Sequence, residues 1–114
     1  MKLIVAGSRE FTDYSTLETE LSNIKDSITE IVSGTARGAD RLGERYANEN
    51  NITLQRMPAE WDKHGRSAGY KRNEQMAEYA DSLIAFWDGQ SRGTKHMIDI
   101  ARRLDLEVIV IKTK

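Results

Sequence analysis

Five short apolar runs constrain the fold of this chain more than any other feature. Several of them are continuous rather than alternating, which is typical of strands covered on both faces, as in a parallel sheet. The runs predict five β-strands, at residues 3–6, 31–32, 52–54, 83–87 and 108–111.

Helical periodicity separates the predicted strands. Apolar residues recur there every three or four positions, which is the spacing of one face of an α-helix. Ser15 and Glu18 predict a capping box at the start of the first helix, and the third helix is expected from about residue 67 to 79. We interpret the four apolar stripes as core packing: Leu17, Leu21, Ile24 and Ile28; Ala39, Leu42 and Tyr46; Met76, Ala77 and Ala80; Met97, Ala101 and Leu104.

Strands and helices thus alternate, which predicts a parallel sheet with right-handed crossovers. We expect a single Rossmann-like α/β domain over residues 1–114, a three-layer fold whose five-stranded sheet has the order 3-2-1-4-5. The flavodoxin-like order 2-1-3-4-5 is the alternative. In either order, ligands bind beyond the carboxyl ends of the strands, near the switch point.

The composition narrows the classes of function. The chain has no cysteine, which excludes disulfides and thiolate metal sites, and its two histidines argue against a multi-histidine centre. We expect no metal site and no required cofactor, although carboxylates could still bind Mg²⁺. Lys and Arg number 17 against 18 Asp and Glu, so the net charge of -1 lacks the basic excess of non-specific nucleic-acid binders. With no signal-peptide pattern and no membrane-length apolar stretch, the expected location is the cytoplasm.

Three glycine-bearing turns follow predicted strands, at residues 7–9, 33–40 and 88–94, and each carries an arginine and a hydroxyl. Glycine permits close backbone approach to a ligand, and the N-terminus of a following helix favours phosphate. In the order 3-2-1-4-5 the three turns meet at one edge, so we expect a phosphate-bearing, nucleotide-like ligand there. The candidate ligand-binding residues, three of them from the segment described next, are Gly7, Ser8, Arg9, Gly34, Thr35, Ala36, Arg37, Gly38, Asp40, Arg66, Arg72, Asn73, Asp88, Ser91, Arg92, Gly93 and Thr94.

Residues 60–73 form the longest stretch without a clear predicted element. The stretch combines Trp61 and Tyr70 with four basic residues. A long loop in a compact domain is often a binding loop or lid, and a solvated loop leading into a helix is the alternative. We expect His64 to be a loop residue and His96 a surface or packing residue, rather than catalysts.

The same motifs resemble those of the SMF/DprA–LOG (SLOG) superfamily, and within it the small YspA/YpsA-like group of phage and bacterial genomes. The resemblance covers nearly the whole chain and lies in VAGSRE, VSGTARGAD, PAEW with HGRSAGYKRNEQM, and ADSLIAFWDGQSRGTKHMI. It implies a Rossmann-like fold that binds nucleotides or nucleotide-derived molecules, as a sensor or a processing domain.

The wider superfamily includes the Lonely guy phosphoribohydrolases, which cleave the N-glycosidic bond of cytokinin nucleotides. Residues 72–76 are similar to their R-K-x-x-M segment, and residues 91–94 to part of their P-G-G-x-G-T-x-x-E segment. The acidic residue of the second segment falls on Met97, which cannot do acid–base chemistry. This departure leaves the phosphate site intact and argues against the hydrolase activity.

Three hypotheses of function result. We favour a domain that binds or senses a nucleotide-like ligand, because the three glycine-bearing turns suit phosphate binding and no clear group of catalytic residues accompanies them. The second is an enzyme acting on an N-glycosidic bond, phosphoribohydrolase or deoxyribosyltransferase-like, with Asp40, Glu74 and Asp88 as weak candidate carboxylates. Asp40 is equally explained as a first-turn aspartate favoured by the helix dipole, and Asp88 as a turn former. The third, single-stranded DNA binding as in DprA, is disfavoured by the near-neutral charge and small size.

A homodimer is the expected assembly, partly because Rossmann-like members of the superfamily commonly pair. Met76, Tyr79, Met97 and Ile100 offer more apolar surface than one sheet face needs, and Met and Tyr are enriched at interfaces. The alternative is that these four side chains belong to the core of a single chain.

Overall fold

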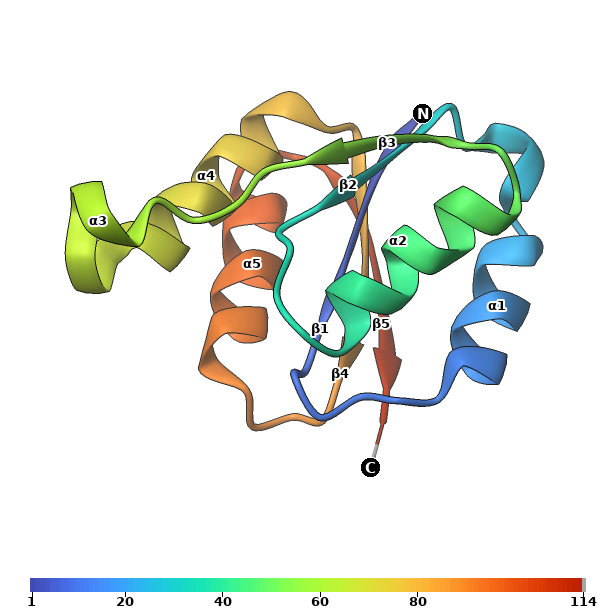
Figure 1. The fold of residues 1–114 in the computed structure, drawn as a ribbon, viewed down its shortest axis with the longest axis horizontal. Coiled ribbons are helices and arrows are strands. Elements are labelled where there is room, and N and C mark those ends of the chain that lie inside the picture. The colour runs from blue at the N-terminus through green and yellow to red at the C-terminus, as the bar shows by residue number, and fades with distance from the viewer. Residues whose placement is uncertain (114) are drawn as a thin grey trace.

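The computed structural model describes residues 1–113 and contains a five-stranded parallel sheet (Figure 1). The strands are β1 (Lys2–Gly7), β2 (Glu30–Ser33), β3 (Thr53–Arg56), β4 (Ser82–Trp87) and β5 (Glu107–Lys112). The helices are α1 (Tyr14–Ser22), α2 (Ala39–Glu49), α3 (Trp61–His64), α4 (Ala68–Tyr79) and α5 (Arg92–Arg103), and 3₁₀ turns lie at Lys25–Ser27 and Gly65–Ser67. All five predicted strands are confirmed.

The sheet has the order β3-β2-β1-β4-β5, which confirms the predicted Rossmann-like order and excludes the flavodoxin-like one. β1 lies between β2 and β4, and Gly7 at its end pairs with Phe86 of β4. The chain runs outward from β1 to β3 and then crosses back to β4 on the other side of β1. The turns after β1, β2 and β4 therefore meet at the switch point, where ligands bind in folds of this kind.

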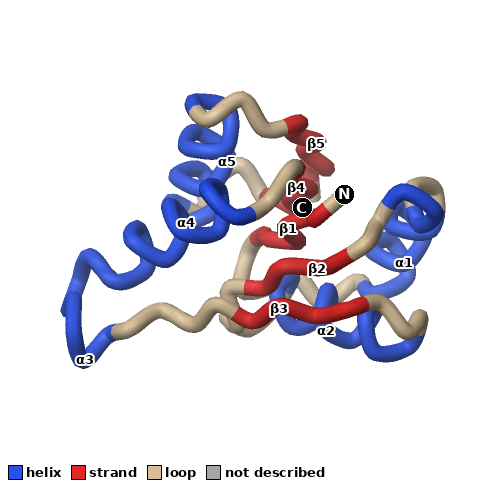
Figure 2. Tube along the Cα trace, turned by 90° about the horizontal axis from the view of Figure 1, so that it is seen from above, coloured by secondary structure: helices blue, strands red, loops and turns tan. Residues whose placement is uncertain are grey.

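Helices cover both faces of the sheet, with α1 and α2 on one face and α4 and α5 on the other (Figure 2). Leu3 and Val5 of β1 share a buried cluster with Tyr46 of α2. Ile4 of the same strand shares the opposite cluster with Met97 of α5. Because successive strand residues point to opposite faces, a strand covered on both faces is apolar at every position.

The first helix differs from its predicted start and end. Asp13, not Ser15, caps α1, because its carboxylate accepts the N–H of Thr16 at 3.1 Å and the Thr16 hydroxyl at 2.6 Å. The predicted capping box is wrong, since the chain is already helical at Ser15. α1 ends before Ile24, so Ile24 and Ile28 pack against the core from the turn that follows rather than from a helical stripe.

The side chains that motivated a homodimer belong to the core of one chain. Met76, Met97 and Ile100 are at most 3% exposed, and Tyr79 is half-buried with its hydroxyl donating to a glutamate of β2. α4 and α5 pack against each other as well as against the sheet, which covers this apolar surface. These residues therefore give no support for a homodimer. Leu104, a predicted core residue, is instead 42% exposed because it lies beyond the last turn of α5.

Residues 60–73 are largely helical rather than a long loop. α3, the 3₁₀ turn Gly65–Ser67 and α4 follow one another directly, and α4 confirms the predicted third helix. α3 stands away from the sheet in both views of the backbone (Figures 1 and 2). Across residues 1–113, no helix combines the length and the apolar character needed to cross a membrane.

Candidate functional site

Three adjoining hollows form a cleft at the carboxyl edge of the sheet, and Arg9 and Arg72 line all three. We call them the outer, aromatic and inner hollows, with volumes of about 440, 200 and 80 Å³. The outer hollow is also lined by Gly34, Thr35, Ala36, Arg37, Pro58, Ala59 and Trp61. The aromatic hollow is lined by Trp61, Arg66, Gly69, Tyr70, Asn73 and Gly93. The inner hollow is lined by Ala6, Gly7, Ala36, Asp40, Asn73, Met76, Ser91, Gly93, Thr94 and Met97.

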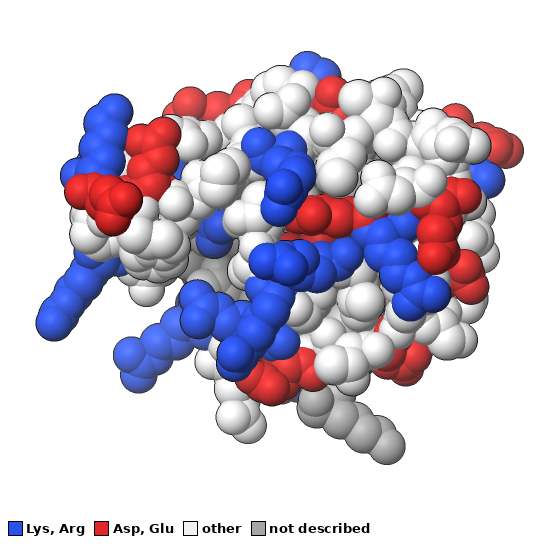
Figure 3. Space-filling model, viewed as in Figure 1, with Lys and Arg blue, Asp and Glu red and all other residues white. Residues whose placement is uncertain are grey.

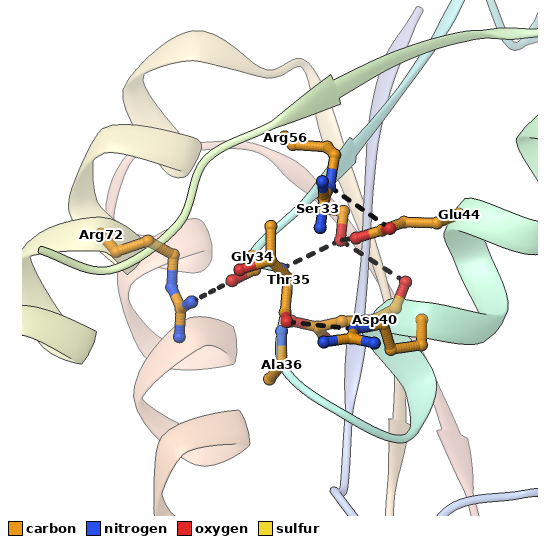
Figure 4. A network of polar contacts seen from close by, with 9 residues as sticks. Ser33, Gly34, Thr35, Ala36, Asp40, Glu44, Arg56 and Arg72 are labelled. Atoms are coloured by element: carbon orange, nitrogen blue, oxygen red, sulfur yellow. Dashed lines mark hydrogen bonds and ion pairs between the residues drawn. The ribbon is translucent and has the colours of Figure 1, made fainter.

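Arg72 links α4 to the loop after β2 (Figure 4). It is half-buried, and its Nη1 donates to the carbonyl of Gly34 at 2.5 Å while its Nε donates to Oδ1 of Asn73 at 3.0 Å. A Cβ atom at Gly34 would lie 2.7 Å from Nη1 of Arg72 and 2.9 Å from Oδ2 of Asp40. Glycine at position 34 therefore lets the guanidinium and the carboxylate approach the loop from two sides.

Side chains of β2 and α2 hold the loop after β2 in place (Figure 4). Oγ of Ser33 accepts the N–H of Thr35 at 3.0 Å and donates to Glu44 at 2.7 Å. Oδ2 of Asp40 accepts the N–H of Ala36 at 3.1 Å. Thr35 has a φ of 68°, a left-handed conformation that is uncommon outside glycine. The N–H groups of Thr35 and Ala36, which were predicted to bind phosphate, thus already donate hydrogen bonds within the chain.

The helices that follow the second and third glycine turns differ at their N-termini. α2 carries Asp40 in its first turn, so a carboxylate of the chain already occupies the position that favours an anion. α5 has no acidic residue in its first turn and no side-chain cap at Ser91. Within residues 1–113, the N–H groups of Gly93 and Thr94 have no acceptor. The N-terminus of α5 is therefore the better anion site of the two.

Asp40 is a buried carboxylate with a perturbed ionisation. Burial raises the pKa of its carboxyl group to about 6, against the opposing effects of the Ala36 N–H and the Arg72 guanidinium. Burial also lowers the pKa of the Arg72 guanidinium, although Asp40 opposes that shift. A titratable group perturbed in this way within a cleft is a candidate for function.

Asn73 connects Arg72 to α5. Its amide oxygen accepts from Nε of Arg72, and its amide nitrogen lies 3.3 Å from the carbonyl oxygen of Gly93 and 3.1 Å from Nδ1 of His96. The His96 ring packs against the Tyr70 ring with their centroids 4.4 Å apart, and burial lowers the pKa of this histidine. Asn73 therefore orients Arg72, while His96 supports Tyr70.

The structure brings most of the predicted site residues to the cleft. Of the three candidate carboxylates, only Asp40 lines it; Glu74 is exposed on α4. The Asp88 carboxylate accepts the N–H groups of Gln90 and Ser91, both at 2.8 Å, so it shapes the turn after β4. The predicted ligand-binding residues that line none of the three hollows are Ser8, Gly38, Asp88 and Arg92.

Several lining residues are not among those predicted from the sequence: Ala6, Pro58, Ala59, Trp61, Gly69, Tyr70, Met76 and Met97. The sequence marks Trp61 and Tyr70 only as aromatic members of a basic segment. Their combination with arginines in residues 60–73 is the signal that could have assigned them to the site. The alanines, glycine and methionines carry no such signal, because small and apolar residues are common throughout a core.

The sheet order and the cleft at its switch point define a Rossmann-like α/β domain with a polar, arginine-lined cleft. The chain belongs to the YspA, cpYpsA-related SLOG family, whose model matches residues 1–64. It is also 34% identical to the Gene 61 protein of Mycobacterium phage D29 over 118 aligned residues, which cover 95% of this chain and 94% of that protein. The superfamily expected from the sequence motifs is therefore confirmed.

The fold also matches a solved structure, that of DNA processing protein A (DprA) from Streptococcus pneumoniae. The TM-score is 0.81 at 17% sequence identity, and the match covers 99% of this chain and 50% of that one. The present chain thus corresponds to about half the length of the DprA structure. At this identity the likeness confirms the Rossmann-like fold alone.

Proposed function

We propose that the cleft binds a nucleotide or nucleotide-derived ligand through its phosphate, as a sensor or processing domain. The observation that carries the proposal is the position of Arg9 and Arg72, which both line all three hollows. Guanidinium groups form paired, charge-assisted hydrogen bonds with phosphate oxygens. The N–H groups at the start of α5 border the same cleft through Gly93 and Thr94 and add a second kind of phosphate donor.

The surroundings of Arg72 make it the stronger of the two arginines. Its guanidinium is half-buried and already oriented by Gly34 and Asn73, so little side-chain entropy is lost when a ligand binds. Arg9 is exposed and carries no such constraint. The electrostatic attraction between a phosphate and a partly desolvated cation is stronger than the same attraction in water.

We expect Arg72→Ala to weaken the binding of AMP or ribose 5-phosphate by about 10- to 150-fold, or about 1.5–3 kcal/mol, the usual contribution of a hydrogen bond to a charged group. Isothermal titration calorimetry would measure the affinities, after native mass spectrometry of the purified protein has identified any nucleotide bound to it. Arg45→Ala is the matched control, because Arg45 pairs with Glu49 and lines none of the three hollows. Equal losses in both variants, or none in either, would contradict the proposal.

A second candidate function is hydrolysis or transfer at an N-glycosidic bond, favoured by the perturbed carboxyl group of Asp40 in the inner hollow. Met97 occupies the position where the resembled hydrolases have an acid, and it is 1% exposed in the core. We therefore expect no measurable release of free base from nucleoside monophosphates. Chromatography of incubated nucleotides checks this, and turnover that Asp40→Asn abolishes would favour the enzyme instead.

Single-stranded DNA binding has one observation in its favour beyond the DprA fold. Lys and Arg side chains gather in the centre and lower left of the face in Figure 3, although the net charge of the chain is -1. A local basic surface attracts phosphates even when the whole chain is near neutral. Adding a single-stranded oligonucleotide to the calorimetric series separates this function from nucleotide binding. The homodimer stays a proposal without support from the residues that suggested it.

A further inference from the structure

Two aromatic side chains of the α3–α4 region are exposed where they would ordinarily be buried. Trp61 is 53% exposed and Tyr70 is 46% exposed, and both line the aromatic hollow. Among residues 1–113, the one other large hydrophobic side chain with comparable exposure is Leu104, which lies after α5 and lines none of the three hollows. Exposed aromatic surface is thus concentrated at the cleft.

Both rings rest on other parts of the cleft. Cη2 of the Trp61 indole lies 3.6 Å from the position of a Cβ at Gly69, so the indole lies against the first turn of α4. The Tyr70 ring packs on His96 at an interplanar angle of 56°, and Asn73 contacts His96 in turn. Aromatic side chains with such support present flat apolar surface at a small further loss of entropy.

The aromatic hollow is continuous with the candidate phosphate site. Arg9 and Arg72 line it together with Trp61 and Tyr70, and Gly93 at the start of α5 borders it as well. A ligand that places its phosphate at the two arginines can therefore reach the two rings with the part that the phosphate is attached to. Flat aromatic groups such as nucleobases stack well on such rings.

We propose that the aromatic hollow holds the base of a nucleotide, stacked on Trp61 and Tyr70, while the phosphate lies at Arg9 and Arg72. This inference rests on the proposed phosphate site and adds the class of ligand, a nucleotide with an intact base rather than a sugar phosphate. Purines bind more tightly than pyrimidines, because the larger ring system buries more aromatic surface.

The test compares AMP, UMP and ribose 5-phosphate by calorimetry with the whole chain. We expect AMP to bind at least about tenfold more tightly than ribose 5-phosphate, with UMP between them. Trp61→Leu and Tyr70→Leu each weaken AMP binding at least about fivefold and leave ribose 5-phosphate binding unchanged. Trp61→Phe retains part of the advantage of AMP because it retains a stacking surface. Leu104→Ala, at a position of comparable exposure away from the cleft, changes neither affinity.

Two results would overturn this inference while the phosphate site stands. The first is equal binding of AMP and ribose 5-phosphate, with both affinities lowered by Arg72→Ala. The second is an advantage of AMP that persists in both leucine variants. If neither compound binds in a manner that depends on Arg72, the proposed function fails together with the inference. Trp61 and Tyr70 are exposed, so circular dichroism of the variants is expected to match that of the native chain.

Discussion

Gly38→Ala is expected to destabilise the fold by about 3–5 kcal/mol, the largest effect we predict for a single methyl group. Gly38 precedes α2 with φ 81° and ψ -130°, a conformation that residues with a Cβ rarely adopt and that costs about 1–3 kcal/mol in strain. A Cβ there would lie 2.4 Å from the carbonyl oxygen of Ser8 and 2.5 Å from that of Arg9.

These contacts are with backbone atoms, so the turn after β1 would have to move. The Ser8 carbonyl accepts the N–H groups of Phe11 and Ala39 at 3.1 and 3.3 Å, and each bond lost adds about 1 kcal/mol. Urea unfolding followed by circular dichroism measures the change. Gly93→Ala is the matched control, because its added Cβ would meet nothing within 4 Å beyond its chain neighbours and the backbone of its own helix.

Because Gly93 lies within α5, alanine there is expected to stabilise the chain by up to about 1 kcal/mol. Destabilisation of the two variants by the same amount would show that the conformation of Gly38 is not the cause. The comparison also bears on the site, because Gly38 lines none of the three hollows and Gly93 lines two of them. We therefore expect substitution of Gly38 to change the stability of the fold, and substitution of Gly93 to change the lining of the cleft.

Asp40→Asn is expected to stabilise the chain by about 2–3 kcal/mol at pH 7.5 and to have little effect below pH 4, since an amide carries no charge to desolvate. The pKa of the Asp40 carboxyl group is about 6 in the folded chain, against 3.8 for an unperturbed aspartate. Between these values the folded chain keeps a proton that the unfolded chain has released. The free energy of unfolding therefore falls as the pH rises through this window.

Above about pH 6 the carboxyl group is ionised in both states, and the full cost of its burial remains. At 1.36 kcal/mol per pH unit, the interval from 3.8 to about 6 corresponds to about 3 kcal/mol. Chemical unfolding at several pH values between 4 and 8 measures the dependence, with the exposed Asp26→Asn as the control. A native-like pH profile in Asp40→Asn would refute the assignment. A carboxylate kept in the cleft at such a cost is consistent with a role in function.

Much of the fold could be predicted because its determinants are local. The continuous apolar runs indicated strands covered on both faces, and the stripes between them indicated helices. The cap of α1 was misplaced because Asp13 and Ser15 are both good capping residues, and only the observed bonds of Asp13 to Thr16 distinguish them. Met76, Met97 and Ile100 suggested an interface but belong to the core, because periodicity does not say how much surface neighbouring helices cover.

The sequence by itself determined the alternation of strands and helices, the family motifs, and the glycine turns that meet at one edge of the sheet. Only the tertiary structure decided which of these residues act together. Arg72 reaches the Gly34 carbonyl across 38 positions of sequence, and Asp40 becomes a perturbed carboxyl group through burial beside it. Trp61 and Tyr70 line one hollow with Arg9 for the same reason. Such contacts depend on where the α3–α4 region is placed relative to the carboxyl ends of the strands, and no local pattern of residues specifies that arrangement.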